Sequence, residues 1–319
     1  EGEMKTSLDC LPCLLRTALE AARMASGDFL VRERVVRDLL RWFSEMDMDG
    51  SPPLLAQRIH RRLRELTGVE DPYREAKDRQ NRMALHFLKE HETGIENAPD
   101  PLDLAVRLAV AANIIDLGAK TSLPEEEIRP ALARAVREPV TGDLEGFRGD
   151  VMRARRILYL ADNAGEIVFD RLLIERLSPD RVTLAVRGKP VINDATLEDA
   201  RAAGLHQLVE VVDNGSDAPG TVLADCSPDF VRRFTEADLI LAKGQGNYET
   251  LSGEPGPIFF LFKVKCPVVA GHVGLPVGAH VLAKGRALRE DPASGEAGSA
   301  GDEPDKPGSG RPVAGRERP

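Results

Sequence analysis

Aromatic residues are scarce in this sequence: ten Phe, three Tyr and one Trp make up about 4% of 319 residues. The core must therefore consist mainly of Leu, Val, Ala and Ile. Cysteine is scarce as well, and four cysteines in a chain of this length exclude a disulfide framework. No apolar run approaches the roughly 18 residues of a membrane span, and no signal-peptide segment is evident. We expect a cytoplasmic protein.

Positive charge is in deficit. The 43 Lys and Arg residues face 52 Asp and Glu residues, which gives a formal net charge of -9. This balance argues against nucleic acid or an anionic membrane surface as the main partner. Small molecules are the expected partners, and the charge says nothing about the oligomeric state.

The first half of the chain has helical periodicity. Apolar residues at helical spacing predict helices over 10–25, 30–46, 54–67, 101–117 and 124–137. A long helix is expected to open at Asp71-Pro72, a cap followed by Pro at the first helical position. No β pattern appears before about residue 155. We predict an all-α N-terminal domain over residues 4–150.

The second half alternates between strands and helices. Strands are predicted at 156–161, 181–186, 208–212, 238–242 and 258–264, with helices at about 166–177, 195–204 and 227–236. The last strand is expected to continue into 267–270, although 258–264 also fits a buried helix segment. This order predicts an α/β domain over 151–284, with a Rossmann-like, mainly parallel sheet and helices on both faces. Residues 285–319 are rich in Gly, Pro, Ser and charge, so we expect a disordered tail.

Polar or glycine-rich turns follow four consecutive predicted strands. The first turn holds Asp162, Asn163 and Glu166, and the last is Lys243-Gly244-Gln245-Gly246-Asn247. Such residues can simply cap the next helix. Because the carboxyl ends of parallel strands share one edge of a sheet, however, four such turns predict a common cleft.

The residues of these turns suit phosphate chemistry. Asp162, Asn163 and Asp194 offer two carboxylates and one amide oxygen, a set that suits Mg²⁺ or Mn²⁺. Lys243 precedes glycines whose N–H groups are expected to form an anion site. We predict Asp162, Asp194 and Lys243 as catalytic, with an aspartate positioning the nucleophile or accepting its proton. KGQGN has neither P-loop nor dinucleotide-binding spacing, which disfavours nucleoside triphosphates and NAD.

Several motifs in order resemble the damage-control phosphatase family, the ARMT-like metal-binding domain. They are ADNAGEIVFD, VINDAT, NGSDAPGT, KGQGNYETL and KCPVV followed by GLPVG. CLPC, DPYREAKDRQN and ANIIDLG resemble its small stand-alone prokaryotic branch, and the resemblance covers roughly residues 4–283. It implies a helical domain on a Rossmann-like domain and metal-dependent hydrolysis of phosphomonoesters. The implied substrates are sugar phosphates or damaged phosphometabolites, and the implied metal is Mg²⁺, Mn²⁺, Co²⁺ or Ni²⁺.

The resemblance also implies residue roles. Asp162 and Asn163 match the family's metal-binding pair, Asp194 its third metal ligand, and Lys243 a lysine that contacts phosphate. Asn113 and Asp116 match a pocket motif from the helical domain; from the residues alone they either bond a helix end or reach the cleft. We also assign to substrate binding the polar and glycine residues of two turns, Glu166, Gly244, Gln245, Gly246 and Asn247.

Some alternatives stay open. Cys10, Cys13 and Cys266 are either buried free thiols, a redox pair, or ligands of a Zn²⁺ ion or an Fe–S cluster. Arg187 either clamps a phosphate or is a surface arginine. The chain is alternatively an S-adenosylmethionine-dependent carboxyl methyltransferase, an activity also proposed for relatives, but Gly165 is the only glycine after the first strand. A third alternative is a non-catalytic metal- or ligand-binding protein.

Overall fold

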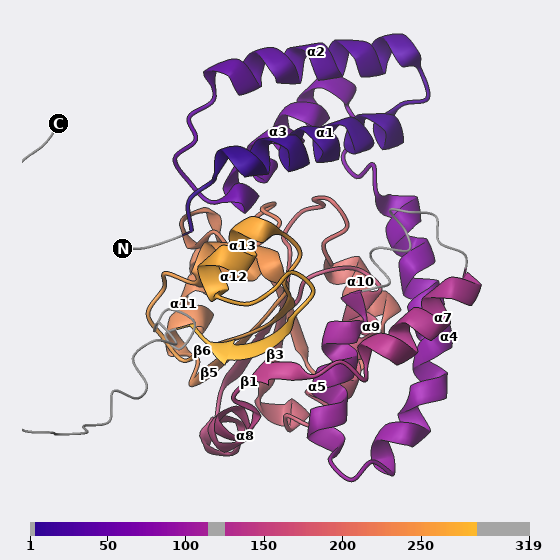
Figure 1. The fold of residues 1–319 in the computed structure, drawn as a ribbon, viewed down its shortest axis with the longest axis vertical. Coiled ribbons are helices and arrows are strands. Elements are labelled where there is room, and N and C mark those ends of the chain that lie inside the picture. Colours follow the sequence, from indigo (N-terminus) through magenta and orange to yellow (C-terminus); the bar gives the residue numbers. More distant parts are fainter. Residues whose placement is uncertain (1–3, 114–124, 286–319) are drawn as a thin grey trace, which may run out of the picture. The chain divides into compact units, whose positions relative to one another are not determined.

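Seven strands form one sheet in the order β1-β7-β6-β5-β2-β3-β4, with helices packed around it (Figure 1). The computed structural model describes residues 4–113 and 125–285, all of them within one compact unit. Two predictions lie outside these residues: the role of Asp116, and the disordered tail apart from its first residue.

The five predicted strands are all present and parallel to one another. Ile258–Lys263 is a strand, so the alternative of a buried helix segment is wrong. The mainly parallel α/β class is confirmed. The strands are β2 (Ile157–Leu160), β3 (Val182–Val186), β4 (Glu210–Asp213), β5 (Leu239–Lys243) and β6 (Ile258–Lys263). The helices after β2 to β5 are α9 (Glu166–Ile174), α10 (Leu197–Ala202), α11 (Pro228–Glu236) and α12 (Gln245–Leu251).

Two strands were not predicted. β7 (His280–Lys284) pairs antiparallel with β6, and β1 (Val140–Gly142) pairs parallel with β7. The expectation of no strand before residue 155 is therefore wrong. β1 has only three residues, none of them fully buried, so it leaves no hydrophobic period in the sequence. The helix α8 (Leu144–Arg153) links it to β2.

The predicted continuation of β6 into 267–270 is also wrong. Residues Pro267–Val273 form the helix α13, which begins after an extended Cys266 and has Pro at its first position. The fixed φ of proline suits a helix start, whereas proline cannot donate a hydrogen bond to a neighbouring strand. The apolar run therefore looked like a strand while its first residue favoured a helix.

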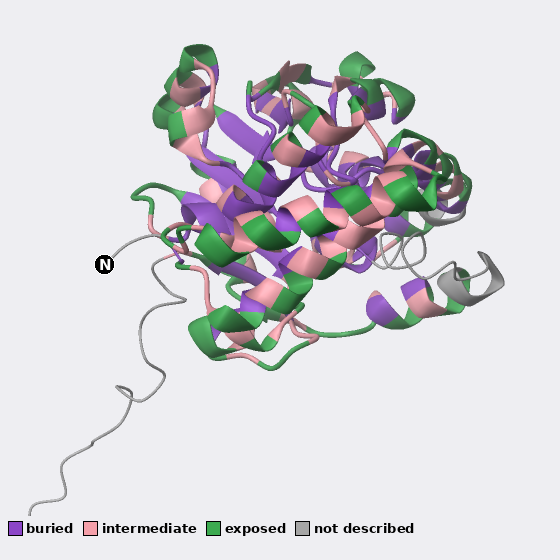
Figure 2. Ribbon diagram, turned by 90° about the horizontal axis from the view of Figure 1, so that it is seen from above, coloured by how far each residue is buried: buried purple, intermediate pink, exposed green. Residues whose placement is uncertain are grey.

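Alternate residues of the strands enter two separate cores. Ile157 and Tyr159 of β2 face one core with α9 and two N-terminal helices, α4 (Arg74–Glu96) and α5 (Pro101–Ala111). Leu158 and Leu160 face the other core with α11, α12 and α13. Figure 2 shows the matching mixture of buried and exposed residues along the helices. Helices thus cover both faces of the sheet, as the sequence predicted.

The N-terminal helices are α1 (Leu11–Ala25), α2 (Phe29–Glu45), α3 (Pro52–Thr67), α4 (Arg74–Glu96), α5 (Pro101–Ala111) and α7 (Glu125–Ala135). Helices α1 to α3 share a core of their own. Short 3₁₀ helices occupy Leu8–Cys10, Pro179–Arg181, Leu205–Gln207 and Leu223–Asp225. The predicted start of α4 is wrong by two residues, because Asp71 caps the turn before it through a 3.0 Å hydrogen bond from Tyr73 N.

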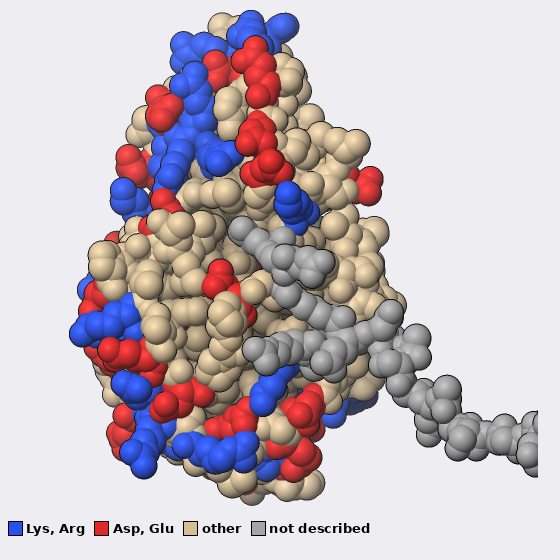
Figure 3. Space-filling view, turned by 90° about the vertical axis from the view of Figure 1, so that its left-hand side faces the viewer, with Lys and Arg blue, Asp and Glu red and all other residues tan. Residues whose placement is uncertain are grey.

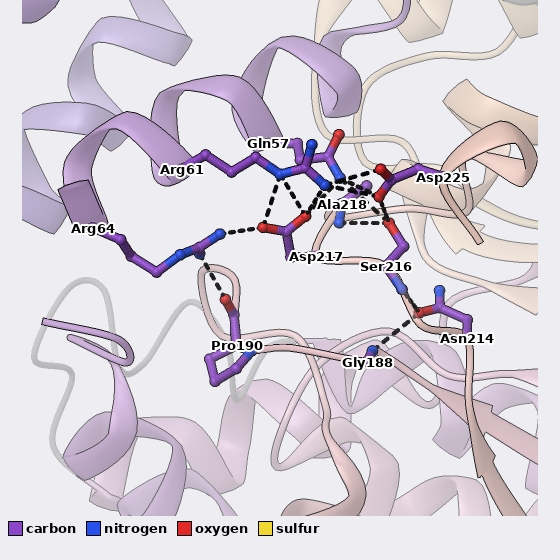
Figure 4. Close-up of polar contacts among 10 residues, drawn as sticks. All are labelled: Gln57, Arg61, Arg64, Gly188, Pro190, Asn214, Ser216, Asp217, Ala218 and Asp225. Atoms are coloured by element: carbon purple, nitrogen blue, oxygen red, sulfur yellow. Dashed lines mark hydrogen bonds and ion pairs between the residues drawn. The ribbon is translucent and has the colours of Figure 1, made fainter. Parts of the chain in front are cut away.

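Helix α3 binds the loops that follow β3 and β4 (Figure 4). Asp217 is almost fully buried, and its carboxylate accepts from Gln57 at 2.7 Å, from Arg61 at 2.6 Å and from Arg64. Arg64 also donates to the carbonyl of Pro190 at 3.1 Å. Burial raises the pKa of Asp217, but the hydrogen bonds from Arg61 and Gln57 outweigh it and hold the pKa below its ordinary value.

We expect Asp217→Ala to lower the free energy of unfolding by about 2–3 kcal/mol, because three donors lose a charged acceptor in a buried position. Urea denaturation measures this loss. Asp49→Ala is the control, since the Asp49 pair with Lys5 is about four-fifths exposed on both sides and contributes little. Equal stabilities of the two variants would contradict the role given to Asp217.

The face shown in Figure 3 carries both signs of charge, with Lys and Arg beside Asp and Glu in its upper and its lower parts. Within residues 4–113 and 125–285, no helix combines the length and the apolar character that a membrane crossing requires.

Candidate functional site

The order in which successive strands are added to the sheet reverses between β2 and β5. From β2 the chain adds β3 and β4 on one side, and it then returns to add β5 and β6 on the other. Ligands of open α/β sheets bind at such a switch point, outside the carboxyl ends of the strands. Asp162 and Asn163 follow β2 at this point, and Lys243 ends β5 beside them.

The turns that carry Asp162, Asn163 and Asp194 are joined through their backbones. Asn163 and Asp194 form an isolated antiparallel bridge. Ala164 N donates to Asn193 O, and Ala195 N donates to Asp162 O, both at 2.8 Å. The three predicted metal ligands are therefore neighbours, and none is more than 6% exposed.

Asp162 lies in surroundings that disfavour a carboxylate. Burial raises its pKa well above the ordinary value, and the charges of Glu166 and Asp194 raise it further, against a lowering by Lys265 and Arg187. Its side-chain hydrogen bond comes from Asn163 Nδ2 at 2.7 Å. Among the described residues no cation forms an ion pair with Asp162. A bound divalent cation would relieve this repulsion, so the residues fit the metal that the sequence predicts.

The described residues contain no group of three or more His, Cys, Asp or Glu side chains arranged around one metal position. The predicted set differs in kind, because it consists of two carboxylates and one amide. Oxygen sets of this size are typical of Mg²⁺, which keeps several of its water ligands.

Lys243 is fully buried. Its ammonium donates to Asp170 Oδ1 at 2.6 Å, to Glu166 Oε1 at 2.7 Å and to the carbonyl of Ala109 at 3.1 Å. Burial lowers the pKa of Lys243, but the charges of Asp170 and Glu166 outweigh this and raise the pKa above its ordinary value. All three N–H groups of Lys243 are thus engaged within the protein.

The two carboxylates bound by Lys243 have different surroundings. Asp170 also accepts from the hydroxyl of Tyr159 at 2.8 Å, and burial raises its pKa to about 6 even though Lys243 lowers it. Glu166 instead faces the predicted metal ligands, and its Oε2 accepts from Asn113 at 2.9 Å and from Asn163 at 3.2 Å. Asn113, which follows α5, therefore connects the N-terminal helices to the site, rather than only bonding a helix end.

The glycines after Lys243 allow other segments of the protein to approach the backbone closely. Gly244 has φ 82°, and a Cβ atom there would overlap the Asp162 carboxylate. Its N–H donates to Leu261 O at 3.0 Å, so it is not presented to an anion. Gly246 lies against the carbonyl of Pro219, where a side chain would not fit.

The other residues of this turn are bound within the protein. Gln245 Oε1 accepts from Lys265 N at 2.8 Å. Asn247 donates to the carbonyls of Ala161 and Lys243, at 3.2 and 2.7 Å.

Arg187 is 2% exposed, so its interpretation as a surface arginine is wrong. Its Nε donates to Asp194 Oδ2 at 2.7 Å, and its Nη1 lies 3.3 Å from both Thr221 Oγ1 and Asn247 Oδ1. Arg187 Nη2 is buried and has no hydrogen-bond partner among the described residues. A buried guanidinium with a free N–H group beside a predicted metal ligand is well suited to an anionic ligand.

The sequence prediction missed Lys265. Lys265 is exposed, and its charge lowers the pKa of both Asp162 and Glu249. It follows β6, which is parallel to β5, so it belongs to the same edge of the sheet. Extending β6 into 267–270 hid this strand end. Ending the strand before Pro267 would have added a fifth turn to the predicted cleft.

Glu249 gives the site a pH-dependent stability. Burial raises its pKa to about 7 from an ordinary 4.5, against a lowering by Gln245 and Lys265. The folded state therefore holds a proton that the unfolded state has lost, and stability falls as the pH rises from about 4.5 to 7. Glu249→Gln should be more stable than the parent at pH 8, by up to roughly 3 kcal/mol, and the difference should vanish near pH 4.5. Urea denaturation at the two pH values measures this, and a gap independent of pH would contradict it.

All four cysteines are free thiols. Cys10 is buried and Cys13 is exposed, and burial raises the pKa of Cys10, with smaller contributions from Glu249 and Cys266. Since no metal-binding group of three such side chains occurs in the described part of the chain, the structure gives no support to a second metal site at these thiols.

A cavity of about 570 Å³ lies at the opposite edge of the sheet, at the amino ends of β2 and β3. Arg155, Arg181 and Arg233 are among its lining residues, and it contains none of the predicted site residues. Because sites in α/β sheets form at the carboxyl ends of strands, we place the candidate site at the switch point.

Comparisons with known proteins identify relatives of this chain. Residues 6–281 match the model of the damage-control phosphatase ARMT1-like domain. A damage-control phosphatase of Archaeoglobus fulgidus is 38% identical over 284 residues, which cover 86% of this chain and 97% of that protein. A damage-control phosphatase of Pyrococcus horikoshii is 34% identical over 289 residues, covering 89% and 99%.

The fold has a solved counterpart. The crystal structure of a DUF89 family protein from Pyrococcus horikoshii superposes with a TM-score of 0.80 at 32% sequence identity, covering 88% of this chain and 98% of that one. The resemblance noted from the motifs is thereby confirmed over most of the sequence. This chain belongs to the family of damage-control phosphatases with an ARMT1-like domain.

Proposed function

We propose that this protein is a metal-dependent phosphatase that hydrolyses phosphomonoesters of small metabolites, namely sugar phosphates or damaged phosphometabolites. The observation that carries the proposal is the buried Asp162 carboxylate at the switch point, which has two acidic neighbours and no ion-pair partner among the described residues. Membership of a family whose relatives are named phosphatases supports the reaction class.

Asp162, Asn163 and Asp194 would hold one divalent cation, Mg²⁺, Mn²⁺, Co²⁺ or Ni²⁺. Such an ion would supply Lewis-acid chemistry, which polarises a phosphoryl oxygen and activates water. Arg187 holds the Asp194 carboxylate through its Nε and keeps Nη2 for a phosphate oxygen. Lys265 adds a second positive charge near Asp162. Together these cations would neutralise the charge of a transferring phosphoryl group.

This proposal gives Lys243 a structural role in place of the phosphate contact that its motif implies. Because its three donors are engaged, Lys243 fixes Glu166 and Asp170 instead of contacting phosphate. Glu166 is then held by Lys243, Asn113 and Asn163 beside the metal ligands, where its carboxylate can accept a hydrogen bond from a substrate hydroxyl. This arrangement favours a hydroxyl-rich substrate such as a sugar phosphate.

Release of inorganic phosphate from a panel of sugar phosphates tests the proposal. We expect release with Mn²⁺ or Co²⁺ and none after treatment with EDTA. Binding of S-adenosylmethionine in calorimetry, without phosphate release from any ester, would overturn the proposal in favour of the methyltransferase. Metal binding without either activity would indicate a non-catalytic protein.

A further inference from the structure

Besides Gln80, the buried face of α4 carries two polar side chains that lie one helical turn apart, Lys77 and Asn81. They are 1% and 3% exposed, respectively. Burying an ammonium and an amide is costly unless both are well paired. Lys77 pairs with Asp199 of α10 and with Asp71, and Asn81 contacts Asp199 and Gly165, which follows the first pair of proposed metal ligands.

The Asn81 side chain bridges these partners. Its Oδ1 accepts from Gly165 N at 2.7 Å, and its Nδ2 donates to Asp199 Oδ1 at 2.8 Å. An N–H group requires an acceptor and a carboxylate requires a donor, so the orientation of the amide is determined. Gly165 lies two residues after Asn163, in the first of the two turns.

Asp199 connects Asn81 to the second turn. Its Oδ2 accepts from the backbone N and from the Oγ1 of Thr196, both at 2.8 Å, and from Lys77 Nζ at 3.1 Å. Thr196 lies two residues after Asp194 and caps α10. An unbroken path of hydrogen bonds therefore runs from Gly165, through the Asn81 amide and the Asp199 carboxylate, to Thr196 beside the turn of Asp194.

We propose that Asn81 is a positioning residue that sets the separation of these two turns and thereby the affinity of the protein for its divalent cation. The inference rests on the proposed function. Two backbone hydrogen bonds already join the turns directly. Asn81 adds a connection to a rigid helix outside them, and such outer partners orient metal ligands. The backbone of Ile192, just before Asn193 and Asp194, has φ 45°, a strained conformation that needs support of this kind.

Asn81→Ala removes both hydrogen bonds of the amide. We expect its dissociation constant for Mn²⁺, measured by electron paramagnetic resonance titration, to rise about 10- to 100-fold. At saturating Mn²⁺, kcat should fall while the KM of the ester changes little, because the residue does not contact substrate. Arg82→Ala is the matched control, since Arg82 is the next residue of α4 and is exposed.

Exchanging the amide and the carboxylate between positions 81 and 199 distinguishes a positioning role of Asn81 from a simple loss of stability. Asn81→Asp places two carboxylates together and should weaken Mn²⁺ binding. Adding Asp199→Asn restores one donor and one acceptor at the same positions, so the double variant should return to within about threefold of the parent. This rescue keeps the test valid even if Asn81→Ala fails to fold.

The outcomes are distinguishable. Parent-like Mn²⁺ affinity in Asn81→Ala, or no rescue in the double variant, would overturn the positioning role and leave the proposed phosphatase intact. If the parent protein binds no Mn²⁺ and releases no phosphate, the proposed function fails and this inference fails with it.

Discussion

Asp162→Asn should abolish phosphate release and at the same time stabilise the metal-free protein. The substitution keeps the shape of the side chain but removes a buried charge that Glu166 and Asp194 repel. A metal ion contributes several kcal/mol to the transition state of phosphoryl transfer, so its loss should lower kcat/KM by about 1000-fold or more.

Asp162→Asn should lose activity but gain stability, and the reason for the gain is electrostatic. Because the pKa of Asp162 is raised in the folded protein, folding at neutral pH requires this carboxyl either to take up a proton or to bury its charge, and both oppose folding. Removing that charge should raise the free energy of unfolding by about 0.5–2 kcal/mol in EDTA, the size common for stabilising changes at functional sites. Added Mn²⁺ should then stabilise the parent and not the variant.

Thermal unfolding with EDTA and with Mn²⁺, alongside a phosphate-release assay, measures both effects. Asp180→Asn, at an exposed carboxylate near the opposite edge of the sheet, is the control and should leave activity unchanged. A fully active Asp162→Asn enzyme would refute the metal assignment.

Lys243→Met should destabilise the protein by about 3–5 kcal/mol, because it leaves two buried carboxylates without their shared cation. Glu166 and Asp170 lie 2.7 and 2.6 Å from the ammonium, and Lys243 is fully buried. The pKa of Asp170, now about 6, should rise further when Lys243 is gone.

Lys265→Met is the matched comparison, since it removes an exposed lysine from the same edge of the sheet. It should leave stability nearly unchanged and raise the KM for a phosphate ester. Urea denaturation of both variants, with kinetics of each, separates a structural lysine from one that binds substrate. A stable Lys243→Met protein with a raised KM would return Lys243 to the phosphate-contacting role that its motif implies.

Much of the fold was predictable because it depends on local periodicity. The five parallel strands have apolar runs bounded by turn residues, and their alternation with helices predicts a parallel sheet. β1 and β7 were missed because they are short and their patterns are weak. β1 has three residues, none of them fully buried, and β7 has only Val281, Leu282 and Ala283 between His280 and Lys284.

The candidate site was predictable in its acidic residues and not in its cations. Asp162, Asn163 and Asp194 stand in turns after strands, so topology alone brings them to one edge. Whether a lysine or arginine faces that edge depends on what else is buried beside it. Glu166 and Asp170 draw Lys243 inward, while Asp194 holds Arg187 with one N–H group free.

By itself the sequence determined the class of the fold, the family, and the turns that carry carboxylates, since these follow from short-range order along the chain. Only the tertiary structure decided which charges neutralise one another. That depends on burial and on contacts between residues far apart in the chain, such as Asn81 with Asp199, 118 positions away, and Lys243 with Glu166, 77 positions away. Away from water a charge must find a partner in the protein, and the choice of partner belongs to the folded state.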